Sequence, residues 1–406
     1  MSLRTLKYAG VAVGAALGLY LSFVALLTVP SLQDQVIYLH SVSLTWFRDL
    51  NAPEQFGFLP NQVTLFTLDT ADGERLHAWH VLPPGLYHEH EAQLCAEPAG
   101  VVNGSAIARR LAFRLLRNDP DSLLVLYLHG AGGTLGSGWR PASYRAMSAA
   151  SPRHIHTLAI DYRGFGASTG RPSEAGLLAD ALALARFAMH AAGIPPDRIV
   201  VFGHSLGTAV ATALAHRLAH AAPSAISNDK VEGLDDESPV FLAGMVLVAP
   251  FTSVEQLTAT YRLAGVVPLL GPVAYYFPRA MAFLHACIRD KWPSADRLAE
   301  FIRAAKAQHL IDRPRYHVTM IHAQDDYDIP WTHAAAMFRH AANAMSDDMA
   351  PGELDEFRSG DVVEWRAPAG VLRAVAPRFG LHDRIMAYPV VSLAVLRAFE
   401  SADHGG

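Results

Sequence analysis

Short apolar runs alternate with amphipathic stretches along most of the chain. Two runs, Val63–Thr67 and His77–Leu82, flank Ala71-Asp72-Gly73 and predict a β-hairpin. Further short runs are of the kind found in buried parallel strands: His156–Ile160, Ile199–Phe202, Met245–Val248 and Val318–His322. Helical stretches fall between them, near 177–190 and 209–220, and either Asp361–Arg366 or Val371–Val375 supplies the last strand. This alternation predicts one large α/β domain with a mostly parallel sheet and helices on both faces.

The N-terminal segment follows a different pattern. From Tyr8 to Gln33 the sequence has no charged residue, and about 20 apolar residues are enough to span a bilayer. A cleaved signal peptide would have a shorter apolar core and a small-x-small cleavage site, so we interpret residues 8–30 as one transmembrane helix. Arg4 and Lys7 precede this span and Asp34 follows it, which predicts a cytosolic N-terminus and a lumenal position for the rest of the chain.

A G-x-S-x-G pentapeptide, Gly203–Gly207, lies between the apolar run Ile199–Phe202 and an alanine-rich helical stretch. A pentapeptide of this kind that closes a strand and opens a helix is typical of a nucleophile elbow, in which a sharp turn lifts a serine hydroxyl clear of the sheet. Only small residues fit the two flanking positions, because the serine backbone is strained and neighbouring chain passes close by. The pattern therefore predicts that Ser205 is a nucleophile.

A serine nucleophile needs a base and an orienting acid, and in this kind of sheet they follow in the order Ser, Asp/Glu, His. Asp325 and Asp326 come directly after the buried run His317–His322, at the edge where α/β sheets place their ligands. His382 precedes the final helix, expected over 387–400, and is the base that this order selects. Both aspartates remain candidates for the acid.

A glycine-rich turn, His129–Gly133, follows the short apolar strand Leu123–Leu128. Its spacing misses the dinucleotide-binding pattern G-x-G-x-x-G by one residue, and no acidic residue follows at the ribose-binding distance. The alternative is an oxyanion hole, in which backbone N–H groups stabilise the negative charge that develops on a carbonyl oxygen. We assign its two donors to Ala131 and Leu206.

Together these motifs resemble the α/β-hydrolase superfamily. More narrowly, they are similar to the membrane-anchored serine hydrolases that include the lysophosphatidylserine lipase and monoacylglycerol lipases of the endoplasmic reticulum. The string D-Y-R-G-x-G-x-S-x-G-x-P-S-E, Asp161–Glu174, is the most branch-specific part. In this family the acid stands four residues before the proline of its loop, so the resemblance points to Asp326, with Pro330 as the reference, and leaves Asp325 as the alternative.

The resemblance implies an α/β-hydrolase fold with an inserted helical cap, preceded by one transmembrane helix. Segments 221–238 and 347–360 are interpreted as further insertions relative to this family, so the resemblance does not define the substrate preference. The expected organisation is a cytosolic N-terminus at 1–7, a transmembrane helix at 8–30, a linker at 31–59, a hydrolase domain at 60–400 with an insertion at 86–120 and a cap at 254–311, and a tail at 401–406.

The expected cap is more apolar than a surface loop needs to be. Its apolar runs are Leu263–Leu270, Tyr275–Phe277 and Met281–Leu284. One interpretation is ordinary packing; the other is an acyl-chain groove, since apolar substrates need a wall that excludes water. In the second case Tyr276, Phe277 and Met281 bind the substrate, and the flexible Met281 suits a lipid tail. Arg140 and Arg262 are candidates to meet an anionic head group.

Composition narrows the range of partners. A net charge of −5 argues against nucleic acid, and two cysteines, Cys95 and Cys287, give no disulfide framework. The sequence His88-Glu89-His90 and the pair His216 and His220 each lack a third ligand, so we expect no metal site. Asn103 lies in the only glycosylation sequon, which agrees with a lumenal orientation.

We therefore expect a membrane-anchored serine hydrolase that cleaves lipid acyl esters, of the lysophospholipase or monoacylglycerol lipase type, without a metal or organic cofactor. Its expected location is the endoplasmic reticulum, with a lumenal catalytic domain. Two alternatives remain open. The chain could be an acyl-protein thioesterase or serine peptidase on the same fold, or a non-catalytic lipid-binding homologue.

Overall fold

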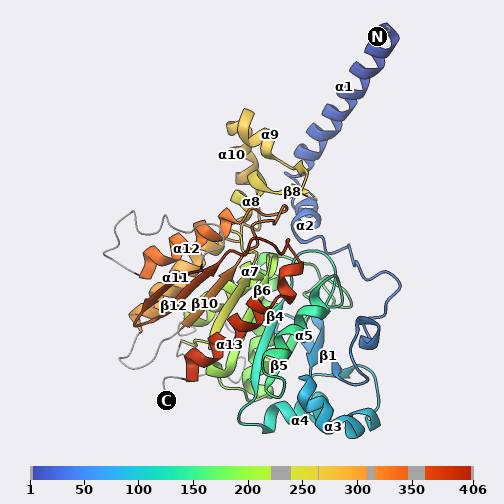
Figure 1. Cartoon of the computed structure of the whole chain (residues 1–406). Coiled ribbons are helices and arrows are strands. Elements are labelled where there is room, and N and C mark those ends of the chain that lie inside the picture. Colours follow the sequence, from blue (N-terminus) through green and yellow to red (C-terminus); the bar gives the residue numbers. More distant parts are fainter. Residues whose placement is uncertain (1–2, 221–238, 264, 309–315, 346–361, 404–406) are drawn as a thin grey trace.

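A single ten-stranded sheet runs through the body of the protein in the computed structural model (Figure 1). The structure describes residues 3–220, 239–263, 265–308, 316–345 and 362–403. The expected insertions at 221–238 and 347–360 lie outside these residues. In the order β11-β12-β10-β7-β6-β4-β5-β2-β1-β3, the strands are β11 Val362–Ala367, β12 Gly370–Val375, β10 Tyr316–Ile321, β7 Gly244–Val248, β6 Ile199–His204, β4 Leu123–Leu128, β5 Ile155–Ile160, β2 Arg75–Val81, β1 Val63–Asp69 and β3 Val102–Asn103.

The six strands at the centre of the sheet, from β12 to β5, are all parallel, as the apolar runs predict. In this register Leu128 pairs with Gly203, and His204 pairs with Val248. The carboxyl ends of β4, β6 and β7 therefore meet at one edge of the sheet, where α/β proteins place their sites.

Helices cover both faces of the sheet, because alternate residues of each buried strand point to opposite sides. Along β6, Ile199 and Val201 join one hydrophobic core while Val200 and Phe202 join the other. The first core is closed by α6 Glu174–Arg186, α7 Leu206–Ala219, α11 Ser294–Ala307 and α12 Thr332–Met345, and the second by α5 Arg140–Ala150 and α13 Pro389–Asp403. The predicted α/β class is confirmed.

Near the edges of the sheet, the structure contains strands and helices that the sequence patterns did not fully predict. The predicted hairpin is present, with β1 antiparallel to β2. Both candidates for the last strand are strands, because β11 pairs with β12 as a second antiparallel hairpin. The region of the expected insertion at 86–120 contains two helices, α3 Pro84–Ala96 and α4 Leu111–Asn118, which share a small core with Leu82.

At the N-terminus, α1 spans Leu3–Leu26 and stands away from the body (Figure 1). Its segment Lys7–Leu26 is long and apolar enough to cross a membrane and is unburied, a property that an anchor and a signal sequence share. Helix α1 ends before residue 30, the expected carboxyl end of the span, because the chain turns after Leu26. There Pro30 begins a second helix, α2 Pro30–Tyr38.

A separate group of elements is inserted between β7 and β10, as the cap prediction requires. It comprises α8 Val254–Thr260, the short antiparallel pair β8 Arg262–Leu263 and β9 Val267–Pro268, α9 Gly271–Tyr276 and α10 Pro278–Cys287. Helix α11, which the expected cap included, packs instead against α7 and α12 in the body. The cap therefore ends before Ser294.

Candidate active site

The turn between β6 and α7 has the geometry of a nucleophile elbow. Ser205 has φ 51° and ψ −119°, in the left-handed region that non-glycine residues rarely adopt. A Cβ atom at position 207 would lie 1.9 Å from the carbonyl oxygen of Leu128, and one at position 203 would lie 2.4 Å from that of Gly207. Because no side chain fits at either place, the two glycines of the pentapeptide let this strained turn pack against β4.

The imidazole of His382 is held by a buried carboxylate. Its Nδ1–H donates to Asp326 Oδ2 at 2.7 Å, and the Asp326 side chain is fully buried. Asp325, the alternative acid, instead accepts a hydrogen bond from the backbone N–H of Leu381 at 2.8 Å. The structure therefore brings Asp326 to the histidine, while Asp325 positions the chain next to it.

Charge and burial compete at this pair. Burial lowers the pKa of His382, but the nearby carboxylate of Asp326 and its hydrogen bond outweigh that effect and raise the pKa to about 9. For Asp326, burial acts in the opposite direction and raises the pKa. The charge of His382 and the hydrogen bonds from His322 and His382 outweigh burial and hold the pKa of Asp326 well below its usual range. Asp326 therefore stays ionised and stabilises an imidazolium at position 382.

Two histidines that the sequence analysis missed support this pair. His322 Nε2 lies 3.1 Å from Asp326 Oδ2 and 3.0 Å from the carbonyl oxygen of Ile329. The buried His204 donates from Nε2 to the backbone oxygen of His382 at 3.0 Å. His322 stands four residues before Asp326 at the end of β10, a spacing that could have indicated the contact.

The glycine-rich loop after β4 lies against the elbow and is fixed from behind by Arg140. The guanidinium of Arg140 is buried and donates to the carbonyl oxygens of Gly130 at 3.0 Å, Gly132 at 2.7 Å and Thr134 at 2.7 Å. The expectation that Arg140 meets an anionic head group is therefore wrong, because its donors point at this loop. Ala131, the expected oxyanion donor, lies in the loop that Arg140 positions.

Helix α2 is locked onto the body by ion pairs between a buried aspartate and two partly exposed arginines. Asp34 is 2% exposed and accepts hydrogen bonds from Arg171 at 3.0 Å and Arg289 at 2.6 Å. Tyr38 donates its hydroxyl proton to Asp290 at 2.7 Å, and its backbone oxygen accepts from Gly132 at 2.8 Å. The start of the expected linker at 31–59 is therefore held against the glycine-rich loop by Tyr38, and Arg171 belongs to the string Asp161–Glu174.

One pocket of about 220 Å³ opens above the elbow and joins these elements. Ser205, Leu206, Ala131 and His382 all line it, so the expected nucleophile, base and oxyanion donors share one space. The rest of the wall is mainly apolar and comes from α2, the cap and two loops: Val36, Ile37, Leu39, Phe251, Val254, Leu257, Tyr261, Leu269 and Ile329.

The three residues expected to bind substrate do not line this pocket. Met281 is buried in a separate cluster with Leu270 and Leu284, and the side chains of Tyr276 and Phe277 are exposed on the cap. The expected wall was therefore assigned to the wrong part of the cap. The cap contributes through α8 and Leu269, and α2 supplies the other side.

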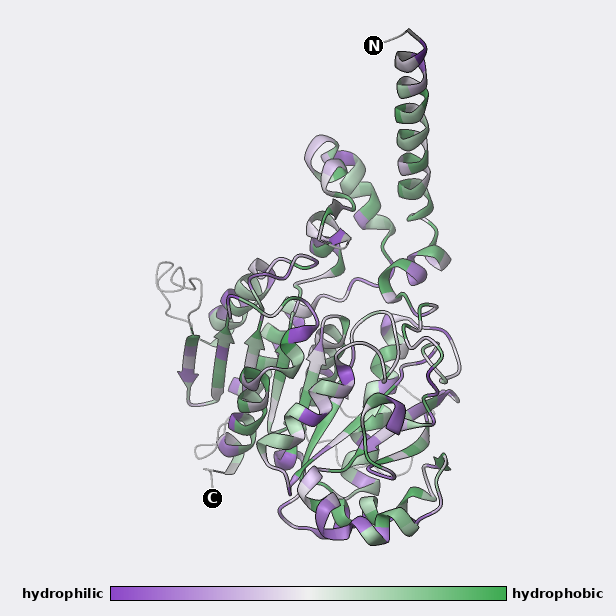
Figure 2. Ribbon diagram, turned by 45° about the vertical axis from the view of Figure 1, so that its right-hand side comes forward, coloured by the Kyte–Doolittle hydropathy of each residue, from purple (hydrophilic) through white to green (hydrophobic). Residues whose placement is uncertain are grey.

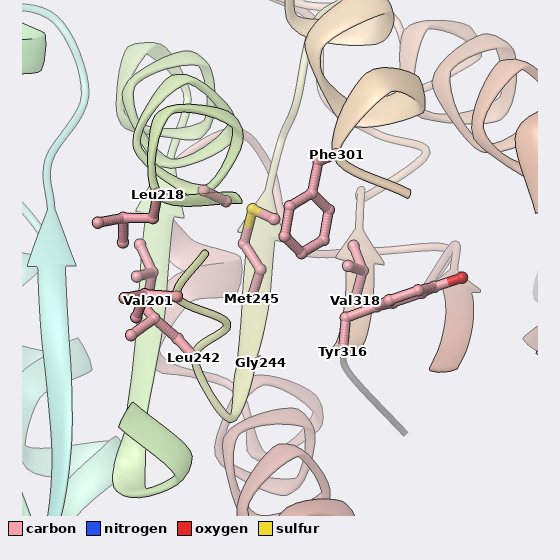
Figure 3. A pocket seen from close by; sticks show the side chains of 10 residues that line it. Val201, Leu218, Leu242, Gly244, Met245, Phe301, Tyr316 and Val318 are labelled. Carbon is pink, nitrogen blue, oxygen red and sulfur yellow. The ribbon is translucent and has the colours of Figure 1, made fainter. Parts of the chain in front are cut away.

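A second cavity lies at the opposite end of the strands, between α7, α11 and the sheet (Figure 3). Gly244 and Tyr316, at the amino ends of β7 and β10, mark its position (Figure 3). Its apolar lining encloses about 10 Å³, at most the room for one water molecule. We interpret it as a packing defect, since it is remote from Ser205.

Other side chains singled out by the sequence lie apart from this pocket. Asn103 is exposed in β3, and its Oδ1 accepts from Ser105 at 2.9 Å. His216 pairs with Glu300 at 2.9 Å. Among the described residues, the groups of His and Asp that could hold a metal ion are His204 with His382 and Asp383, and Asp326 with Asp328 and His382. Both share His382 and so belong to the site already described.

The elbow, the ordered Ser, Asp and His, and the parallel sheet together define an α/β hydrolase. A family model described as "Alpha/beta hydrolase family" matches residues 125–403, and the chain belongs to this family. It is similar to the lysophosphatidylserine lipase ABHD12 of Danio rerio, with 28% identity over 81% of this chain and 72% of that protein. It is also similar to protein ABHD12B of Homo sapiens, with 27% identity over 77% of this chain and 70% of that protein.

The fold agrees with a solved structure. The crystal structure of an alpha-beta hydrolase from Vibrio vulnificus matches with a TM-score of 0.53 and 14% identity, over 91% of this chain and 92% of that chain. At this identity the match shows the fold alone. The chain is thus an α/β hydrolase, distantly related to lysophosphatidylserine lipases.

The raised pKa of His382 predicts how activity depends on pH. A base must be neutral to accept a proton, so we expect kcat/KM to fall as the pH drops below about 9, the pKa to which Asp326 raises His382. In Asp326→Asn the carboxylate charge is absent, and the residual activity should decline only at lower pH. Ester hydrolysis measured across pH checks this. The pairing of Asp326 with His382 would be contradicted if the acidic limb of the pH profile of Asp326→Asn lay at the same pH as in the unsubstituted protein, or at a higher pH.

Proposed function

We propose that this hydrolase is a membrane-anchored serine carboxylester hydrolase that cleaves acyl esters of single-chain lipids. The observation that carries the proposal is the arrangement around one pocket. The strained Ser205 opens into the same space as His382, and the far nitrogen of that imidazole is held by the buried Asp326. Acyl transfer uses a serine, a base and an orienting acid, so this arrangement supports the proposal.

In the proposed mechanism, His382 takes the hydroxyl proton of Ser205 as the oxygen attacks the ester carbonyl. Asp326 fixes the orientation of the imidazole and stabilises the imidazolium that forms. The backbone N–H groups of Ala131 and Leu206 stabilise the tetrahedral oxyanion, each by roughly 3 kcal/mol. His382 then protonates the departing alcohol, and water enters to hydrolyse the acyl-enzyme by the same steps.

The walls of the pocket support an acyl chain as the bound group. Val36 and Ile37 of α2 line the pocket together with Leu39 just after it, and the cap adds Leu257 and Leu269. A hydrocarbon chain would therefore lose water on several sides. The relative from Danio rerio is named a lysophosphatidylserine lipase, which supports lysophospholipids or monoacylglycerols as the substrate class. Arg262, exposed on the cap, remains our candidate for an anionic head group.

A substrate series tests this proposal. Each methylene that enters the pocket contributes about 0.8 kcal/mol. We therefore expect long-chain monoacyl esters to be cleaved much faster than short soluble esters. Triacylglycerols should also be slow, since two further chains have no place in the pocket. Rates in mixed micelles, with matched thioesters and peptides alongside, decide between the enzyme classes. Equal turnover of short soluble esters would overturn the lipid assignment, and preferred cleavage of thioesters or peptides would replace it.

We also propose that α1 is a retained anchor and that the domain faces the lumen of the endoplasmic reticulum. Arg4 and Lys7 lie at the amino-terminal end of the apolar segment, and the exposed Asn103 is accessible to glycosylation. Protease added to intact microsomes should then leave residues beyond 35 intact until detergent is present. Digestion of the domain in sealed microsomes would reverse the orientation and remove the support for modification at Asn103.

A further inference from the structure

The tip of the cap exposes large apolar side chains that no part of the described chain covers. We name the segment Val266–Phe283, which includes β9, α9 and most of α10, the cap hairpin. Its exposed large side chains are Val266 at 78%, Tyr275 at 80%, Tyr276 at 71%, Phe277 at 65% and Phe283 at 62%. Arg279 is the one charged residue between Leu263 and Leu284. A water-exposed surface of this composition would be unfavourable, which indicates a partner.

The base of the cap is fastened to α1 near the start of the cap hairpin, and to α2 just beyond its end. The hydroxyl of Tyr20 donates to the backbone oxygen of Leu269 at 3.1 Å, just before α9. The side-chain amide of Gln33 donates to the oxygens of Leu27 at 2.8 Å and Cys287 at 2.7 Å, at the end of α10. Between these bonds, Val24 packs against the buried apolar cluster of the cap.

These contacts fix the depth of the cap hairpin relative to the span. Tyr20 precedes the end of the span by six residues, which at 1.5 Å per residue is about 9 Å along the helix axis. From this level the cap hairpin stands beside α1, on the same side of the body (Figures 1 and 2). If α1 crosses the bilayer, the tip of the cap lies within the hydrocarbon layer and not above it.

We propose that the cap hairpin inserts into the lipid leaflet that surrounds the carboxyl half of α1, next to the membrane-spanning helix. This inference rests on the proposed role of α1 as an anchor. The partner is the acyl layer itself, because the exposed surface continues directly from the span and carries aromatic side chains. The long side chain of Arg279 can reach the level of the head groups while its stem stays in the apolar layer.

Insertion gives the pocket a direct connection to the bilayer. Leu269 both lines the catalytic pocket and contacts Tyr20 of the span. A single-chain lipid could therefore move from the leaflet to Ser205 along the foot of the cap hairpin, without passing through bulk water. The exposed Tyr276 and Phe277 contact membrane lipid in this arrangement and not the substrate's reacting end.

Lipid-borne quenchers test the insertion in the full chain, reconstituted in phosphatidylcholine nanodiscs. In a Cys95→Ser, Cys287→Ser background, single cysteines carry an environment-sensitive fluorophore. Phe277→Cys reports the cap hairpin, Gly14→Cys reports the span, and Glu91→Cys reports exposed α3 at the far end of the body (Figure 1). Nitroxide-labelled phosphatidylcholine should remove most of the emission at 277 and 14 and little at 91, and emission at 277 should be blue-shifted.

Each other result overturns the proposal in an identifiable way. Quenching at 14 without quenching at 277 places the cap hairpin outside the lipid. A blue shift at 277 without lipid quenching means that a second copy or another protein covers it. Loss of quenching at 14 removes the anchor and the insertion together. Fluorophosphonate labelling of the same preparations is independent of these results. Its absence would overturn the catalytic proposal and leave the insertion standing.

Discussion

Ser205→Ala and His382→Ala each abolish ester hydrolysis, with a loss on the order of 10⁶-fold in kcat. The two residues act as a unit, because the serine hydroxyl is a weak nucleophile until the imidazole removes its proton. We therefore expect the double variant to be no slower than either single variant. Turnover of a long-chain monoacyl ester, corrected for the amount of folded protein, measures the loss.

The control for these variants is His340→Ala. His340 is partly exposed and pairs with Asp296 on the surface, so its loss should leave both folding and turnover unchanged. Far-ultraviolet circular dichroism establishes that each variant is folded. Turnover that survives in Ser205→Ala, or losses that multiply in the double variant, would contradict the assignment of nucleophile and base.

Asp326→Asn lowers kcat on the order of 10⁴-fold, whereas Asp325→Asn has a much smaller effect. An amide at position 326 can donate to His382 and so favours the wrong tautomer of the imidazole. An amide at position 325 retains an oxygen that accepts from the backbone N–H of Leu381. The two substitutions are isosteric neighbours and serve as controls for each other. Losses in the reverse order would assign the acid to Asp325.

The candidate reacting groups could be identified from the sequence because each is tied to a local pattern. The two glycines around Ser205 are recognisable in the sequence because only glycine fits at these positions. A side chain at 207 would clash with β4, and one at 203 would clash with the turn itself. His382 and the two aspartates follow from the chain order that the sheet imposes. The choice between adjacent aspartates depended on the family resemblance, and the structure places Asp326 against His382.

The surroundings of the site could not be predicted in the same way, because the contacts join distant parts of the chain. Nothing in the local pattern of α2 indicates that Asp34 binds Arg171 and Arg289, which are more than a hundred residues away. Arg140 lies next to the glycine-rich loop in the sequence, but its position alone does not distinguish a guanidinium that binds ligand from one that binds loop carbonyls.

The apolar composition of the cap also did not identify which of its side chains line the pocket. The cap segment is apolar in the sequence, but hydropathy does not say whether a side chain faces substrate, core or lipid. The structure separates these cases: Leu269 faces the pocket, Met281 is buried, and Phe277 is exposed. The insertion expected at 86–120 overlaps two helices that its polar residues concealed, and they bury only a small core with Leu82.

The most direct test of the central claim is to identify the residue that reacts with a fluorophosphonate. The full-length protein in mixed micelles is treated with the probe, digested and analysed by peptide mass spectrometry. We predict one adduct, on the peptide that contains Gly203–Gly207, with the added mass on Ser205, and its loss when a long-chain monoacyl ester competes. An adduct on another residue, or an unmodified Ser205 in protein that still hydrolyses the ester, would contradict the proposed mechanism.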